Sequence, residues 1–517
     1  MPLKIAIIGA GAVGWTRTLL RDLLGVPEFA GMHYALTDIS AHNLDMAYQL
    51  CRRDVSENNL PTTITQSTDR RATVADADYV ICAIRQGGLE AFKTDIEIPL
   101  KYGVDQCVGD TLCAGGIMYA QRTIPALLDF CKDIREVAKP GAWMLNYANP
   151  MAMNTWAASE YGGVCTIGLC HGVQGAHWQI TRAIEHWARA KKIIGADETL
   201  DHKTDVQVVA AGLNHQTWFV KINFRGHDIV PLLPEIFDKA RDFATTEKVR
   251  IDVLKRFGYY STESNGHLSE YLPWYRKRTE RINDWIDLGN WINGETGGYL
   301  RVCTEGRNWF ETEFPEWLKE PPKAFDAKER SHERGSYILE ALETGRIFRG
   351  HFNVPNRGAI PNLPADAIVE IPGYVDRNGI NITQVGALPL GCAAVCSVSI
   401  SVQRLAVEAA VRGDDQLLRQ AMMMDPLVGA VCNPPEIWQM VDELLVAQAA
   451  WLPQYAGAIA AARARLDGGK KIATRQTEGA ARLHTKTVDE MRLDRDAATK
   501  NAANPDKAKE RPAQAAH

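Results

Sequence analysis

Short apolar runs alternate with helix-period segments in the first part of the chain. The runs are typical of buried strands and occupy Lys4–Ile8, Tyr34–Thr37, Tyr79–Ile84, Trp143–Tyr147 and Thr166–Leu169. A leucine stripe with helical spacing follows the first run, at Leu19, Leu20, Leu23 and Leu24. This alternation predicts an α/β fold with a Rossmann-type, doubly wound parallel sheet over residues 1–200.

The pattern changes after residue 200. Two strand-like runs, Val206–Ala211 and Trp218–Phe224, precede mixed helical segments that include Pro234–Phe243 and Ser331–Glu343. We expect a second, α+β domain over residues 201–455. From Ala460 the chain has 13 Lys+Arg, 8 Asp+Glu and almost no large apolar residues. Residues 456–517 are therefore predicted to be a largely disordered, solvated tail with a helix at most over Gly479–Ala497.

Composition excludes several classes of protein. Hydrophobic residues make up 46% and charged residues 23% of the 517 residues, and the net charge is -5. These values are typical of a globular protein and argue against nucleic-acid binding. No apolar run approaches the ~18 residues of a membrane helix, and the start has no signal-peptide pattern. The 11 cysteines are scattered, with no CxxC, which predicts free thiols and a cytoplasmic location.

A glycine motif follows the first strand. Gly9, Gly11 and Gly14 fit GxGxxG between a strand and a helix, and Asp38 ends the next strand. In such a unit the glycines allow a tight turn, close approach of a pyrophosphate and close helix–sheet packing, while the acid binds a ribose hydroxyl. A carboxylate there repels a 2′-phosphate, so the pattern favours NAD over NADP. The alternative is a glycine turn without a ligand.

Two further clusters carry polar side chains. Asp110 lies before Gly115-Gly116, predicted to be a turn, and a helix expected near Ile117; Asn149 precedes a proline after the Trp143–Tyr147 run. Ligands of open α/β sheets bind at the carboxyl ends of strands, where Asn149 is expected. Taken alone, a helix cap and an Asn-Pro turn explain these two residues as well.

Cys170-His171-Gly172 and Asn214-His215 follow two further strand-like runs. Cys170 and His215 are candidate ligands of a divalent metal, and a thiolate with an imidazole suits a softer first-row ion better than magnesium. The alternative is a buried cysteine and a core histidine.

Taken together, the motifs GAGAVG, DTLCAGG, MLNYANPMAMNTW, GLCHGVQG, AGLNH and YYSTESNGHLSEYLPWY resemble the family 4 glycoside hydrolases, which depend on NAD and manganese(II). The resemblance is strongest to the bacterial α-galactosidase branch and extends to about residue 455. It implies a lactate/malate dehydrogenase-like architecture and a homo-oligomer, a dimer or tetramer. It also implies glycoside cleavage by transient oxidation at sugar carbon 3, elimination, water addition and re-reduction, an exception to two-carboxylate hydrolysis.

The resemblance assigns roles residue by residue. Cys170 and His215 match the metal ligands, Tyr271 matches the base at sugar carbon 2, and Asp110 matches the acid of the leaving group. Three further positions match residues that line the sugar or metal site: Asn149, His171 and Asn214. A tyrosine needs a cationic environment to act as a base at neutral pH.

Two departures bear on the substrate. The α-galactosidase branch usually has serine where this chain has Gly172, and glycine is expected to leave room for another substituent. Arg85 stands where a neutral residue is expected. It is either a surface or nucleotide-phosphate contact or a cation for an acidic sugar.

We therefore expect a glycosidase acting on α-linked hexosides, α-galactosidase-like. The alternative within the class acts on an anionic glycoside, a sulfoquinovoside or α-uronide. A net NAD-dependent sugar or hydroxy-acid dehydrogenase and a catalytically silent NAD sensor are the alternatives of other classes.

Overall fold

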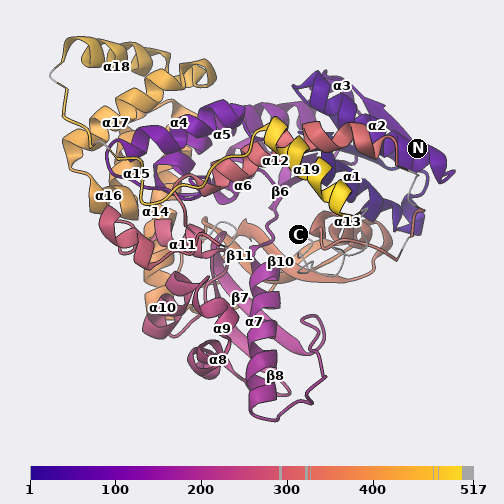
Figure 1. Cartoon of the computed structure of the whole chain (residues 1–517). Coiled ribbons are helices and arrows are strands. Elements are labelled where there is room, and N and C mark those ends of the chain that lie inside the picture. Colours follow the sequence, from indigo (N-terminus) through magenta and orange to yellow (C-terminus); the bar gives the residue numbers. More distant parts are fainter. Residues whose placement is uncertain are drawn as a thin grey trace.

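The computed structural model describes residues 2–289, 294–320, 324–326, 328–469, 471–475 and 477–502. Among these residues one sheet of 12 strands runs through the molecule, and helices cover it (Figure 1). Six of the strands form a parallel half in the order β3-β2-β1-β4-β5-β6. Their bounds are β1 Lys4–Ile8, β2 His33–Thr37, β3 Thr63–Gln66, β4 Tyr79–Cys82, β5 Trp143–Asn146 and β6 Cys165–Gly168. The prediction of a Rossmann-type parallel sheet is confirmed, with β3 added to the strands that the sequence indicated.

Antiparallel strands extend the same sheet beyond β6. β10 pairs with β6 at Asn353 and Gly168, and β11 pairs with β7 at Glu370 and Gly212. The bounds are β7 Val206–Leu213, β8 Gln216–Phe224, β9 His227–Asp228, β10 Phe348–Pro355, β11 Ile368–Asp376 and β12 Gly379–Ile382. The strands β10 to β12 were not among the expected elements. Because this extension joins directly to the parallel half, a division between domains at residue 200 stays a prediction.

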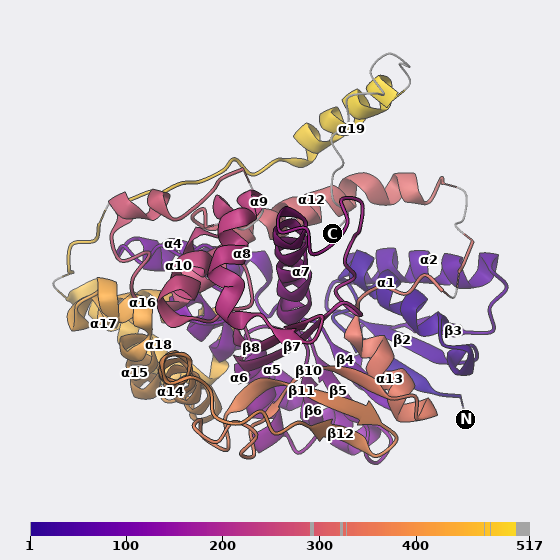
Figure 2. The same ribbon diagram turned by 90° about the horizontal axis from the view of Figure 1, so that it is seen from below.

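The helices of the parallel half connect its strands and cover both of its faces. Figure 2, turned by 90°, shows α1 and α2 on one side of the sheet and α5 and α6 on the other. The bounds are α1 Val13–Leu24, α2 Ala41–Glu57, α3 Arg70–Val74, α4 Gly88–Leu100, α5 Cys113–Val137, α6 Met151–Ala157 and α7 Gly172–Ala190.

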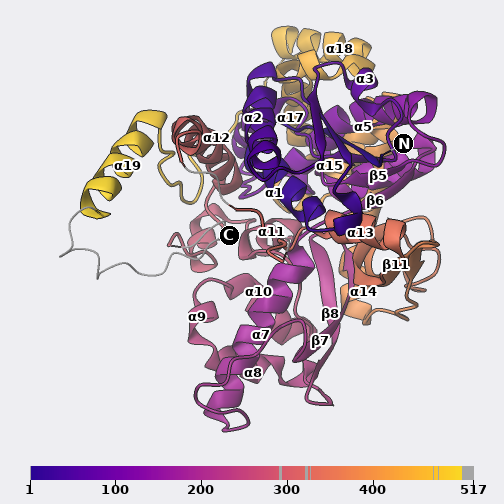
Figure 3. The ribbon, with the colours of Figure 1, turned by 90° about the vertical axis from the view of Figure 1, so that its right-hand side faces the viewer.

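The second half of the chain adds more helices, and some form a lobe of their own. In Figure 3 the helices α7, α8 and α10 pack beside β7 and β8, around a separate apolar core that includes Ile184, Phe219 and Tyr260. The bounds are α8 Leu233–Lys239, α9 Arg241–Ala244, α10 Lys248–Phe257, α11 Asn265–Tyr271, α12 Gly298–Trp317, α13 Arg334–Thr344, α14 Leu390–Arg412, α15 Asp415–Met424, α16 Pro426–Val431 and α17 Pro434–Ala447.

Helix α14 is long and apolar enough to span a membrane by length and composition alone, with a mean hydropathy of 1.6. The expectation that no segment approaches this length and hydropathy was therefore wrong. Half of the helix window is buried inside the protein, and Cys392, Cys396 and Ile400 on this helix belong to the main apolar core. A core helix meets the same criteria as a membrane span, so α14 is explained by packing.

The C-terminal segment differs from the expected solvated tail. It begins with α18 Ala456–Gly468 and ends, within the described residues, with α19 Val488–Ala502. Between them residues 471–475 and 477–487 form a strap that runs along the body to α12, and α19 lies beside α12 (Figures 1 and 3). The strap is held by hydrogen bonds between polar groups, including Ile472 to Gln439, Arg475 to Lys101, Arg482 to Glu97 and Lys486 to Glu305. The composition argument missed this order because these bonds require no apolar side chains. Residues 503–517 of the predicted tail lie outside the described residues.

The strap contacts a buried charge. The carboxylate of Asp105 is fully buried and pairs with Arg276, which is also buried. The Thr296 hydroxyl donates to this carboxylate at 2.9 Å, and the backbone N–H of Ala480 in the strap donates to it at 2.8 Å. A hydrogen bond to a charged group is worth about 1.5–3 kcal/mol. The strap thus helps to satisfy an ion pair inside the protein.

Truncation tests this contribution. A chain that ends at Gly469 loses the bond to Asp105, so we expect its thermal midpoint to fall below that of the full chain in a thermal-shift measurement. A chain that ends at Ala502 is the matched control and keeps every strap contact. Equal midpoints for the full chain and the chain ending at Gly469 would show that the strap does not stabilise the fold.

Candidate active site

Cys170, His215 and Glu263 form a compact cluster of groups that can ligate a metal. One ligand atom from each residue lies within 4.8 Å of the other two. The Oε1 atom of Glu263 is 3.4 Å from the Cys170 Sγ atom and 3.7 Å from the His215 Nε2 atom. The structure therefore brings together the two predicted ligands and adds a carboxylate that the sequence analysis did not single out.

Each of these side chains comes from the end of an ordered element. Cys170 follows β6, and its Sγ atom accepts the N–H of Gly172 at 3.3 Å, at the start of α7. His215 lies in the turn between β7 and β8 with φ 63°, and Glu263 precedes α11 with φ 70°. Left-handed conformations are uncommon for residues other than glycine and concentrate at functional sites. Both side chains are thus aimed by backbone turns.

A hydroxyl relay fixes the proton on His215. The Thr111 hydroxyl donates to Oδ1 of Asp110 at 2.7 Å, and its oxygen lies 2.7 Å from Nδ1 of His215. A hydroxyl has one hydrogen, and the Asp110 carboxylate only accepts. Thr111 must therefore accept the N–H of Nδ1, which leaves Nε2 of a neutral His215 with a free lone pair toward Cys170 and Glu263. This is the tautomer that a metal at Nε2 requires.

Asp110 accepts hydrogen bonds from two neighbours and caps no helix. The side-chain amide of Asn149 donates to its Oδ2 atom at 2.7 Å, opposite the Thr111 bond. Helix α5 begins at Cys113, before the expected Ile117. Gly115 and Gly116 lie inside this helix, so the predicted glycine turn was wrong. A Cβ at Gly116 would lie 2.4 Å from the Thr111 backbone, so the glycines let α5 pack against the loop that carries Asp110.

Glu270 connects that loop to the helix of the predicted base. Its carboxylate accepts the backbone N–H groups of Cys107 at 2.8 Å, Val108 at 3.0 Å and Gly109 at 2.8 Å. Burial raises the pKa of Glu270 to about 7, although the Val108 and Gly109 N–H groups act to lower it. Since Tyr271 is the next residue, the Glu270 side chain fixes the position of Tyr271 relative to the loop that carries Asp110.

The hydroxyl of Tyr271 is buried and makes no well-formed hydrogen bond among the described residues, although the Thr111 side chain lies beside it. Burial raises the pKa of Tyr271 well above its usual value, and the charges of Asp110 and Glu270 raise it further. The protein alone therefore disfavours the tyrosinate. A cation beside the hydroxyl is needed before Tyr271 can accept a proton near neutral pH.

The predicted sugar-lining residues divide into two groups. Asn214 is buried beside the Cys170 thiol, and neither polar atom of its side chain makes a well-formed hydrogen bond among the described residues. The His171 ring instead turns to Glu333, 3.0 Å away, with 55% of its side chain exposed. Glu333 also accepts a hydrogen bond from Trp15 in α1. His171 thus faces the nucleotide side of the site.

Gly172 does not leave a free space for a sugar substituent, contrary to the expectation. A Cβ at this position would lie 1.8 Å from the Oε1 atom of Glu263. The room that glycine leaves is filled by a carboxylate from the same protein.

Sequence reasoning also missed His267. Its ring packs edge-on against His215, with ring centroids 4.8 Å apart, and lies 6.0 Å from the Tyr271 ring. Ser264 fixes its Nδ1 atom at 2.7 Å. Glu263, His267 and Glu270 all lie in the quoted Tyr259–Tyr275 stretch, whose density of polar residues was the available signal.

The glycine motif lies where a dinucleotide site requires it. A Cβ at Gly9 would lie 2.2 Å from the carbonyl oxygen of Ala83, and the N–H of Gly11 donates to Asp38 at 2.8 Å. Asp38 also accepts the Ser40 N–H, and a carboxylate retains acceptor sites for ribose hydroxyls. A Cβ at Gly14 would lie 2.8 Å from the Phe310 ring of α12, so the absence of a side chain at Gly14 lets α12 pack there.

Arg85 is half-buried, and aromatic rings surround its guanidinium group. Its guanidinium carbon lies 4.3 Å from the Phe92 ring centroid, 5.0 Å from that of Tyr119 and 5.4 Å from that of Tyr299. Its Nη1 atom is buried and has no hydrogen-bond partner among the described residues. Burial acts to lower the pKa of Arg85, but neighbouring groups that include Asp110 raise it overall. The side chain is thus a cation that aromatic rings enclose at the carboxyl end of β4.

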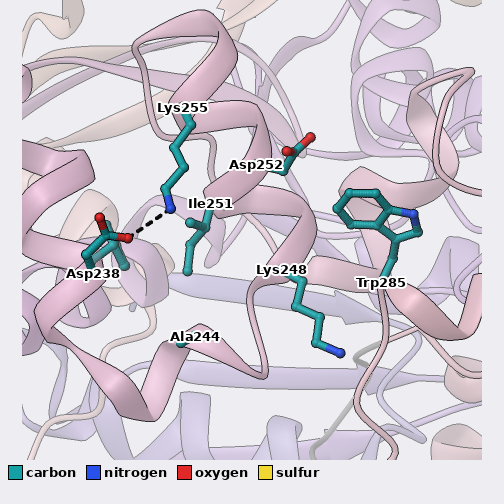
Figure 4. A pocket seen from close by; sticks show the side chains of 8 residues that line it. Asp238, Ala244, Lys248, Ile251, Asp252, Lys255 and Trp285 are labelled. Atoms are coloured by element: carbon teal, nitrogen blue, oxygen red, sulfur yellow. Dashed lines mark hydrogen bonds and ion pairs between the residues drawn. The ribbon is translucent and has the colours of Figure 1, made fainter.

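A separate pocket of about 300 Å³ between α8 and α10 contains none of these residues (Figure 4). Its charged side chains are already engaged: Lys255 pairs with Asp238 at 2.8 Å, and Asp252 accepts hydrogen bonds from Arg256 and Tyr275. We assign no chemistry to this pocket.

Five of the predicted site residues lie at the same edge of the sheet. Gly9, Asp38, Arg85, Asn149 and Cys170 follow β1, β2, β4, β5 and β6 in turn. Ligands of parallel α/β sheets bind at this carboxyl edge. A Rossmann-type sheet with an acid, a tyrosine and a metal-type cluster at this edge defines an enzyme.

Comparison with known proteins gives its family. Residues 4–186 match the family 4 glycosyl hydrolases and residues 210–428 match the C-terminal domain of the same family. An alpha-galactosidase of Rhizobium meliloti (strain 1021) is 57% identical, over 97% of this chain and 99% of its own. An alpha-galactosidase of Bacillus subtilis (strain 168) is 35% identical, over 87% of this chain and 99% of its own. The structure of a 6-phospho-alpha-glucosidase from gut microorganisms, in complex with NAD and Mn2+, aligns with a TM-score of 0.70 at 20% identity, over 88% of this chain and 99% of that one.

The chain belongs to the family 4 glycosyl hydrolases. The predicted family and the predicted glycosidase class are confirmed, which excludes the catalytically silent sensor and the net dehydrogenase as descriptions of its class.

The Thr111 relay predicts a specific defect. Thr111→Val keeps the shape of the side chain but cannot accept the Nδ1 proton of His215, so Mn2+ affinity is expected to fall about 10–100-fold, as for other partners of a ligating histidine. Thr111→Ser restores the hydroxyl and should bind Mn2+ like the wild type. A Mn2+ titration followed by electron paramagnetic resonance measures both, and unchanged affinity in the valine variant would refute the relay.

Proposed function

We propose that this enzyme hydrolyses α-galactosides and requires NAD+ and a divalent metal ion, manganese(II). The observation that carries the proposal is the continuous chain of contacts from Asn149 through Asp110 and Thr111 to His215 and the Cys170 cluster. It joins an acid to a metal-type site at the edge where the glycine motif lies. The two alpha-galactosidase relatives support the choice of sugar.

The residues present fit both groups. Cys170 and His215 would hold the metal, because their donor atoms converge and the His215 tautomer exposes Nε2. Gly9, Gly11 and Asp38 would hold the dinucleotide. When bound, NAD+ supplies a reversible hydride acceptor, and the metal supplies positive charge beside the sugar oxygens. The unpartnered polar atoms of Asn214 provide further contacts for hydroxyl groups.

The protein supplies the proton transfers. Asp110 lies between two hydrogen-bond donors. In its protonated form it gives a proton to the leaving-group oxygen, and the carboxylate that results then takes a proton from water. Tyr271 accepts the proton from sugar carbon 2. Its unpartnered hydroxyl and the charges that disfavour its anion mean that the tyrosinate forms only in the metal-loaded site.

We further propose that the enzyme is cytoplasmic and assembles as a homo-oligomer, a dimer or tetramer. All eleven cysteines are free thiols in the structure, which suits a reducing compartment. The assembly follows from the resemblance to family members.

A second candidate substrate is an anionic α-glycoside, a sulfoquinovoside or α-uronide. Arg85 favours it, because among the described residues no carboxylate lies within ion-pair distance of its guanidinium group. Desolvated guanidinium groups bind carboxylate, sulfonate and phosphate oxygens strongly.

A substrate panel tests the function and separates the two candidates. With catalytic NAD+, Mn2+ and a reductant, we expect many aglycone molecules released per NAD+ from an α-galactoside. The α-glucoside, α-galacturonide and α-sulfoquinovoside are measured on the same sample. Accumulation of NADH in a one-to-one ratio with consumed substrate would refute the hydrolase. Preference for an anionic substrate, lost in Arg85→Met, would establish the second candidate.

Tyr271→Phe tests the base. The wild type should exchange the hydrogen on sugar carbon 2 with solvent deuterium, as measured by nuclear magnetic resonance. The phenylalanine variant lacks the acceptor oxygen, so we expect exchange to disappear and turnover to fall by about 10²–10⁴-fold. Normal exchange in Tyr271→Phe would assign the base to another residue.

A further inference from the structure

Glu263 is a buried carboxylate whose partners are unusual. Its side chain is 13% exposed, and within the described part of the chain no lysine or arginine lies within ion-pair distance of it. Its contacts are the Cys170 thiol at 3.4 Å, the His215 ring at 3.7 Å and the His267 ring at 3.9 Å. Buried charges in proteins are paired or coordinate metals. None of these three neighbours carries a permanent positive charge, and Arg250 acts on the carboxylate only from beyond ion-pair distance.

The backbone holds this carboxylate in place. Glu263 adopts φ 70°, a conformation that costs a non-glycine residue about 1–3 kcal/mol. The flanking residues are fixed, because the Thr262 N–H donates to the Thr217 carbonyl at 2.8 Å and Ser264 caps α11. The strained residue therefore projects from a well-anchored segment toward the Cys170 and His215 donor atoms.

Gly172 provides an independent observation on the same carboxylate. Its φ is not in the left-handed region, so the backbone alone would accept alanine or serine. The obstacle is Glu263, whose Oε1 atom lies 1.8 Å and whose Cδ atom lies 2.7 Å from the Cβ position. A side chain at position 172 would therefore require the Glu263 carboxylate to leave its present place.

We propose that Glu263 is a third protein ligand of the divalent ion held by Cys170 and His215, and that residue 172 is glycine to admit it. This inference rests on the proposed metal dependence. A thiolate, a carboxylate and a neutral imidazole around a divalent ion give a neutral centre. Three protein ligands with open positions are typical of catalytic metal sites, and the carboxylate oxygen suits Mn2+ better than sulfur and nitrogen alone.

Mn2+ affinity tests the assignment without relying on activity. The NAD+-saturated protein is titrated with Mn2+, and the free ion is quantified by electron paramagnetic resonance. Glu263→Gln keeps the shape and removes the charge, and we expect its Kd to rise by more than about 100-fold, beyond the range of partners that only orient ligands. A smaller rise would overturn the proposal.

Gly172→Ala tests the pairing from the other side. The added methyl group displaces the carboxylate, so the Kd for Mn2+ should rise, and the double variant with Glu263→Gln should bind no more weakly than Glu263→Gln alone. Additive losses would contradict the shared cause. Gly175→Ala is the matched control on the same helix, because no atom lies within 4 Å of its Cβ position. Thermal midpoints of all variants report on folding.

Cys170→Ser separates this inference from the proposed function. If serine at 170 leaves Mn2+ binding unchanged, the proposed metal site itself is wrong. If Cys170→Ser loses Mn2+ but Glu263→Gln keeps it, the site stands and the role of Glu263 is refuted.

Discussion

The site depends on one buried carboxylate whose hydrogen bonds hold the backbone of the loop that leads to Asp110. Glu270 accepts three successive backbone N–H groups from residues 107–109, and its chain neighbour is Tyr271. Losing this acceptor would leave three buried donors unsatisfied, each at a cost of about 1–3 kcal/mol. The loop that carries Asp110 and helix α11, which carries Tyr271, therefore cannot move independently. Burial raises the pKa of Glu270 to about 7, so this connection is itself close to its titration range at neutral pH.

The metal-type cluster assembles only because the sheet is continuous. Cys170 follows the last parallel strand, while His215 lies in the turn of an antiparallel hairpin and Glu263 comes from the segment before α11. The strands β10 and β11 lie between β6 and β7 and join these segments in one sheet. Three donors that are distant in the sequence thus meet at the boundary between the parallel half and its extension.

The sequence predicted the features that depend on local pattern or motif. The parallel strands and the glycine motif follow from apolar runs and glycine spacing. Asp110, Cys170 and His215 were candidates from their local sequence, and only the family resemblance assigned their roles. The roles of Thr111, Glu263, His267 and Glu270 depend on contacts between distant segments, which periodicity does not report. Gly172 was misread because a missing side chain suggested space for a ligand, whereas a carboxylate fills it. The strap was missed because its order arises from hydrogen bonds to a buried ion pair.

The Thr111 hydroxyl has a thermodynamic consequence for the whole site. It donates to Asp110 only while that carboxylate is ionised. A proton on Asp110 would allow the hydroxyl to reverse, donate to Nδ1 of His215 and shift the histidine proton to Nε2, the atom that faces Cys170 and Glu263. Proton uptake at the acid and ion occupancy at the imidazole would then oppose each other. Such antagonistic linkage is reciprocal, so a bound ion would weaken the hold of Asp110 on its proton and make the protonated Asp110 a stronger donor to a glycosidic oxygen.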